Sequence, residues 1–186
     1  MSLLAAYGLL AHGLLCGALA SLLPLGRLRQ RAALIATAIA LLAGIAPVLH
    51  AWFGPPSITL LLLALLCLSP RIRPPLNAQS AACFLAFGAL FYLAQWLPGA
   101  GWRGVWPYAL GYQPRELLIA LGVLALVLGW RRQSLWLLIL AVDLGAWLSG
   151  IFANLWDVLF DPLLLLLCAG ILIRQALRRF FSARRR

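Results

Sequence analysis

The feature that most constrains this chain is its series of long apolar runs, most of which stop beside arginine, proline or glycine. A helix that crosses about 30 Å of hydrocarbon needs about 20 apolar residues, so we interpret each run as a membrane span. The pattern predicts seven spans, over residues 3–23, 32–53, 58–69, 80–97, 116–130, 134–156 and 162–173. Six spans is the alternative, because the third and fifth runs are short and either could be re-entrant.

The composition excludes a water-soluble domain. Of the 186 residues, 65% are hydrophobic and 10% are charged, whereas a soluble domain is about half apolar and a quarter charged. Seven helices would use about 140 residues and leave only short connections. We therefore expect an all-α bundle, a single polytopic transmembrane domain over residues 1–186 with a basic tail at 174–186.

The basic residues predict the orientation of the spans. All 15 of them are arginine, and the formal net charge is +11. Arginine-rich segments alternate with arginine-poor ones, the rich segments being 24–31, 70–79, 131–133 and the tail 174–186, and the poor ones 54–57, 98–115 and 156–161. Because cytoplasmic loops carry an excess of arginine, we expect the N-terminus outside and the C-terminus inside. The charge then needs no nucleic-acid partner, and the arginine-only, leucine- and alanine-rich composition favours a bacterial cytoplasmic (inner) membrane.

Two further patterns predict contacts with the membrane and with other helices. The tail should bind anionic lipids, at about 1 kcal/mol for each basic residue near the surface, through Arg174, Arg178, Arg179, Arg184, Arg185 and Arg186. Gly13 and Gly17 form a G-x-x-x-G pattern, which is typical of close helix packing. The neighbouring helix could belong to this chain, to a second copy or to another membrane protein.

Two ionisable residues fall deep in the predicted spans. His12 and Asp143 each lie about nine residues from a span end, which puts both about 14 Å deep. Charged and titratable groups at this depth are costly and often functional. A pair between them could couple protons to transport, or each could make a structural hydrogen bond.

A second set of polar residues falls at the predicted outer ends of the spans. It could line an outward-facing polar vestibule, or the charges could simply be solvated at the interface. The set consists of His50, Arg103, Arg115, Glu116, Asn154, Asp157 and Asp161. Most tryptophan and tyrosine residues map to the same boundary, where such residues anchor helices. The alternative is an outward-facing site for a ligand among these aromatic side chains.

Motifs for catalysis and cofactor binding are missing from the sequence. Without lysine the chain cannot form a Schiff base or a P-loop, and it contains neither C-x-x-C nor H-E-x-x-H. His12 and His50 differ in predicted depth by about 9 Å, which fits poorly with two axial ligands of one haem. We therefore expect no enzymatic activity, metal or cofactor. The leading hypothesis is a non-enzymatic accessory or structural subunit of a membrane complex, and the alternative is a small proton-linked transporter or channel.

Overall fold

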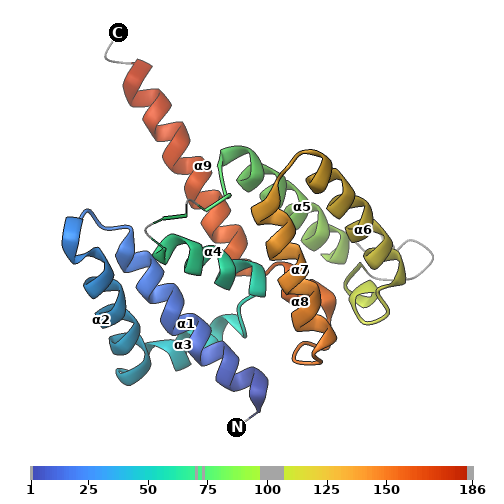
Figure 1. The fold of residues 1–186 in the computed structure, drawn as a ribbon, viewed down its shortest axis with the longest axis horizontal. Helices are drawn as coiled ribbons and strands as arrows, with labels where there is room; N and C mark the ends of the chain where they lie inside the picture. The colour runs from blue at the N-terminus through green and yellow to red at the C-terminus, as the bar shows by residue number, and fades with distance from the viewer. Residues whose placement is uncertain (1, 70, 73, 97–106, 184–186) are drawn as a thin grey trace.

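The computed structural model describes residues 2–69, 71–72, 74–96 and 107–183, and the regular elements in these segments are all helices (Figure 1). The prediction of an all-α protein is therefore confirmed for these segments. The α-helices are α1 (Leu3–Ser21), α2 (Arg29–Leu42), α3 (Ile45–Phe53), α4 (Ile58–Leu68), α5 (Ala78–Trp96), α6 (Arg115–Trp130), α7 (Ser134–Leu148), α8 (Leu155–Leu159) and α9 (Pro162–Ala183). Two 3₁₀ turns, η1 (Gly26–Leu28) and η2 (Pro107–Gly111), complete the described elements.

The helices differ in whether they are long enough to cross a membrane. Two segments in the described residues are both long and apolar enough, α1 and the combined stretch Leu155–Phe181. The pair α2 and α3 makes a third candidate if the two are counted as one bent span. Shorter apolar helices lie at Ile58–Leu68, Ala78–Ala94 and Ser134–Leu148. The structure thus supports two or three candidate spans and does not establish a seven-span bundle.

Two of the predicted spans are not single helices. The run over 32–53 is bent by 73° between α2 and α3, where Gly44 has a φ of 78°. That left-handed conformation is costly for a residue with a side chain, and it ends the α-helical hydrogen-bond pattern. The run over 134–156 also breaks, because α7 ends at Leu148 and Gly150 has a φ of 76°. Trp156 therefore belongs to the short helix α8.

The packing of α1 against α2 depends on small residues. A Cβ atom on Gly13 would lie 2.8 Å from Leu41 Cγ, and one on Gly17 would lie 2.8 Å from the carbonyl oxygen of Ala33. Both glycines of the G-x-x-x-G pattern therefore face α2, so the helix that they approach belongs to this chain. Figure 1 shows α1, α2 and α3 on one side of the molecule and α5, α6, α7 and α8 on the other, with α4 between them.

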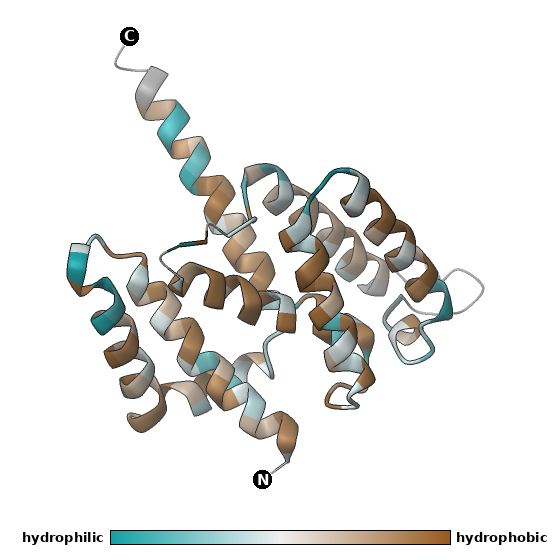
Figure 2. Ribbon diagram, viewed as in Figure 1, coloured by the Kyte–Doolittle hydropathy of each residue, from teal (hydrophilic) through white to brown (hydrophobic). Residues whose placement is uncertain are grey.

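The surface of the helices is unusually apolar. Leu42, Trp52 and Trp130 are each more than 80% exposed, and apolar residues cover most of the ribbon in Figure 2. Hydrophilic residues gather at the start of α2, in the turn between α6 and α7, and along the outer half of α9. A water-soluble monomer rarely exposes so large an apolar area, so this surface suits contact with lipid.

Candidate functional site

A group of buried polar side chains lies where α1, the start of α4, α7 and the start of α9 meet. We call it the central polar cluster, and its members are Tyr7, His12, Ser57, Thr59, Asp143 and Asp161. All except Tyr7 are less than 9% exposed. Burying a polar group is costly unless it is hydrogen-bonded, so the partners of these groups indicate what the cluster does.

Asp143 connects α7 to α4. The hydroxyl of Thr59 donates a hydrogen bond of 2.7 Å to Asp143 Oδ2, and the aspartate side chain is only 2% exposed. The second carboxyl oxygen, Oδ1, has no hydrogen-bond partner among the described residues. One oxygen therefore holds two helices together, while the other is left unsatisfied.

Asp161 lies at the first turns of two helices. Its Oδ1 atom accepts a hydrogen bond of 2.8 Å from the backbone N–H of Leu164, as an N-cap residue of α9 would. Its Oδ2 atom accepts from the backbone N–H of Ser57, which is 104 residues away and is the N-cap of α4. A carboxylate is favoured at the positive end of a helix dipole, and here it is shared by two of them. Asp161 precedes Pro162, and an aspartate followed by proline is typical of a helix start, whereas nothing in the sequence indicates the link to α4.

His12 bonds to its own helix, and Asp143 is not its partner. Its Nδ1 atom lies 2.7 Å from the carbonyl oxygen of Gly8, and Nε2 has no partner among the described residues. The pair of His12 and Asp143 that we considered from their depths is therefore not formed. Asp143 accepts a hydrogen bond from Thr59 instead, and the ring beside His12 is that of His50.

His50 lies closer to His12 than its position along the sequence suggests. The two ring centroids are 5.9 Å apart, and the ring planes make an angle of 72°. The predicted depth difference of about 9 Å was wrong because it assumed a straight span, whereas the chain bends at Gly44. Gly8 provides the space, since a Cβ atom there would overlap the His50 imidazole.

The residues proposed for an outer vestibule do not line one common site. Asp161 belongs to the central polar cluster, and His50 packs beside His12. Arg115 and Glu116 are exposed in the first turn of α6, as expected for Glu116 at a helix N-terminus. Arg103 lies outside the described residues. Among the described members of the set, Asn154 and Asp157 share a hydrogen-bond partner, as described next.

Asn154 and Asp157 both bind Tyr108 in η2. The side chain of Asn154 donates to the Tyr108 carbonyl oxygen at 3.1 Å and accepts from the backbone N–H of Trp156 at 2.9 Å. The Tyr108 hydroxyl donates to both oxygens of Asp157 at 3.0 Å. Burial raises the pKa of the Tyr108 hydroxyl, and the negative charge of Asp157 raises it further. The phenol therefore keeps its proton and acts as a donor.

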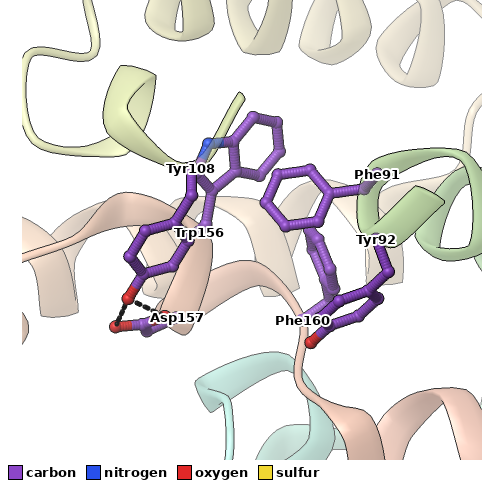
Figure 3. Close-up of a pocket in the computed structure, with 6 residues that line it drawn as sticks. All are labelled: Phe91, Tyr92, Tyr108, Trp156, Asp157 and Phe160. Carbon is purple, nitrogen blue, oxygen red and sulfur yellow. Dashed lines mark hydrogen bonds between the residues drawn. The ribbon is translucent and has the colours of Figure 1, made fainter. Parts of the chain in front are cut away.

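The same region contains a pocket of about 130 Å³. It is lined by Phe91, Tyr92, Tyr108, Trp156, Asp157 and Phe160, which Figure 3 shows as sticks. The indole N–H of Trp156 donates to the carbonyl oxygen of Pro107 at 2.8 Å and so holds η2 against α8. We call this site the aromatic pocket. Five of its six side chains are aromatic, and the sixth is a carboxylate.

The basic tail continues α9 as a helix as far as Ala183. Figure 1 shows this end of α9 extending beyond the other helices. Arg174 and Arg178 are exposed there, whereas Arg184, Arg185 and Arg186 lie outside the described residues. The contact of the tail arginines with anionic lipid stays a prediction.

Comparisons of the chain with known protein families, with curated proteins and with solved structures found no match. The described residues contain no group of three or more histidine, cysteine or acidic side chains that could hold a metal ion.

The central polar cluster includes three residues that the sequence did not single out, Tyr7, Ser57 and Thr59. The Tyr7 hydroxyl donates to the carbonyl oxygen of Pro56 at 2.8 Å. The role of Ser57 as an N-cap has a local signal in the sequence, because Ser57 follows two prolines and precedes an apolar run. Nothing in the sequence shows which distant residues Tyr7 and Thr59 contact.

Proposed function

We propose that this chain is a non-enzymatic, multi-pass protein of a bacterial inner membrane that serves as an accessory or structural subunit of a membrane complex. The observation that supports this most is the use of its buried polar groups. The bonds Thr59–Asp143, Ser57–Asp161 and Tyr7–Pro56 each join segments that are distant in the sequence. Such bonds fix helices relative to one another, which is what a scaffold requires.

We propose further that the chain crosses the membrane seven times, with the N-terminus outside and the C-terminus inside. The contacts between junctions support this topology. The Arg29 guanidinium donates to the carbonyl oxygen of Cys67, next to the 70–79 junction, so two arginine-rich junctions lie together. Ser57 and Asp161 likewise join two arginine-poor junctions. An alternating topology requires this grouping. Fluorescent-protein and phosphatase reporters fused at the C-terminus and after Ile151 test it, with opposite signals expected at the two sites.

The surface best suited to a test of the accessory role is the outer face of α6. This helix packs mainly against α7 and η2, and Ile119 and Leu126 are 70% and 76% exposed. A Cβ atom on Gly122 would meet nothing within 4 Å, so a neighbouring helix could approach closely there. The face therefore offers apolar side chains beside a small residue.

Site-specific photocrosslinking in native membranes tests the accessory role. We expect a crosslinker at Val123 on α6 to give a discrete protein adduct, and Gly122→Leu to abolish it, because a large side chain would keep the partner helix away. The control position is Ile35 on α2, which is similarly exposed at 59% compared with 57% for Val123. Lipid adducts alone at both positions would contradict the proposal.

The second candidate function is proton-linked transport. It is favoured by two buried atoms without hydrogen-bond partners among the described residues, Asp143 Oδ1 and His12 Nε2. The assay is proton uptake into liposomes that contain the purified protein and a pH-sensitive dye. Uptake that Asp143→Asn abolishes and Glu116→Gln preserves would replace the accessory role with transport. Absence of uptake by the wild type would eliminate this candidate.

A further inference from the structure

The aromatic pocket lies between segments that are distant in the sequence. Phe91 and Tyr92 come from α5, Tyr108 from η2, and Trp156, Asp157 and Phe160 from α8 and the residue after it. Phe91, Trp156 and Phe160 are each less than 10% exposed, whereas Tyr92 is 36% exposed. The pocket thus has a buried aromatic wall and reaches the surface near Tyr92.

The rings of the wall meet at steep angles. The centroids of Phe91 and Phe160 are 4.9 Å apart at 88°, and those of Phe91 and Trp156 are 5.0 Å apart at 57°. Tyr92 meets Phe91 at 89°. The ring planes therefore lie at large angles to one another and are not stacked in parallel. In Figure 3, Tyr108, Trp156 and Asp157 lie on the left of the view, and Phe91, Tyr92 and Phe160 lie on the right.

Among the described residues, the charge in the pocket is negative and has no counter-ion. Asp157 accepts hydrogen bonds from the neutral Tyr108 hydroxyl, and no arginine bonds to it in the part of the chain that the structure describes. This is unusual for a chain with 15 arginines and only four acidic residues. The faces of aromatic rings attract cations within about 6 Å of the ring centroid. The rings and the carboxylate of this pocket therefore both favour a positively charged ligand.

We infer that the aromatic pocket binds a methylated ammonium group, such as a quaternary ammonium. A primary ammonium carries three N–H donors that need acceptors, whereas this pocket is lined by five aromatic side chains and a single carboxylate, which already accepts from Tyr108. A quaternary ammonium donates no hydrogen bond and is bound by aromatic cages. The volume of about 130 Å³ is close to that of a cavity of about 150 Å³ that holds benzene, so one such group fits.

This ligand chemistry has two sources, a free small molecule and the headgroup of a lipid. Four of the six lining residues, namely Tyr108, Trp156, Asp157 and Phe160, belong to the predicted outer junctions at 98–115 and 156–161. Lipid headgroups lie at the membrane–water interface, which is where these junctions are predicted to lie. The inference does not depend on the accessory role, since either source could bind a scaffold or a transporter.

The experiment uses the full chain purified in a maltoside detergent, which has no charged headgroup. Equilibrium binding of radiolabelled choline is measured in competition with tetramethylammonium and with 3,3-dimethylbutanol, the neutral isostere of choline. In a parallel arm, thermal unfolding is followed after addition of phosphatidylcholine, phosphatidylethanolamine or phosphatidylglycerol.

Two results support the inference and distinguish the sources. Saturable choline binding, with the isostere at least tenfold weaker, indicates a free ligand. A larger rise in Tm with phosphatidylcholine than with the other two lipids, without choline binding, indicates a lipid headgroup. Equal binding of choline and its isostere, or no binding of choline together with equal effects of the three lipids, would overturn the inference.

Variants connect the binding to the pocket. We expect Asp157→Asn and Tyr92→Leu each to weaken binding about tenfold, which is about 1.4 kcal/mol. The amide oxygen that Asp157→Asn introduces can still accept from Tyr108, and Tyr92 is partly exposed, so both variants should fold, as unfolding without ligand will verify. The control is Tyr112→Leu, because Tyr112 packs on Tyr108 outside the pocket. Unchanged binding in both pocket variants would also overturn the assignment.

Discussion

Replacing Asp161 with alanine should destabilise the protein strongly, because this carboxylate serves two helix starts. The substitution removes the N-cap of α9, which costs about 1 kcal/mol. It also leaves the backbone N–H of Ser57 buried without its acceptor, at a cost of about 1–3 kcal/mol. We therefore expect the free energy of unfolding to fall by about 2–4 kcal/mol. Asp161→Asn keeps one of the two acceptor oxygens and should lose about half as much.

The assay is reversible unfolding in mixed maltoside and dodecyl sulfate micelles, followed by tryptophan fluorescence and by circular dichroism. The matched control is Glu116→Ala, since Glu116 also lies in the first turn of a helix but is exposed. Its interaction with the helix dipole is worth less than about 1 kcal/mol. A fall of less than about 0.5 kcal/mol for Asp161→Ala, below the usual cost of losing a cap, or equal falls for the two variants, would refute the claim that Asp161 links α4 to α9.

Three further predictions use the same unfolding assay. Gly17→Ala should cost about 1–3 kcal/mol by forcing α1 away from α2, whereas Gly122→Ala, where a Cβ meets nothing within 4 Å, should be neutral or slightly stabilising. Gly44→Ala should lower the free energy of unfolding by about 1–2 kcal/mol, since the φ of 78° at this position strains any residue with a side chain. The control is Gly170→Ala in α9, where a Cβ atom would meet nothing within 4 Å. The raised pKa of Tyr108 means that the folded state holds this proton more tightly than the unfolded state, so stability present below about pH 10 should fall as the pH rises above it. Tyr108→Phe should reduce this loss of stability at alkaline pH. An equal loss in the wild type and the variant would contradict the role of Tyr108.

Several local features could be predicted because their signals lie within a few residues. Apolar runs became helices, Asp161 before proline marked the start of α9, and Glu116 fell in the first turn of α6. Each of these depends on propensity or on the free N–H groups of a helix end. The length of the helices was less predictable. An apolar run does not reveal that Gly44 will adopt a left-handed conformation and divide a span.

By itself the sequence determined that this chain is helical and strongly apolar, with its basic residues concentrated at the helix ends. Hydropathy and net charge depend on composition and order alone. Only the tertiary structure decided that Asp143 meets Thr59, that His12 lies beside His50, and that one carboxylate joins α4 to α9. It also brought the rings of the aromatic pocket together from three separate segments. The depth of a residue in a helix follows from counting, but its neighbour depends on how each helix is rotated and bent, which packing between distant segments sets.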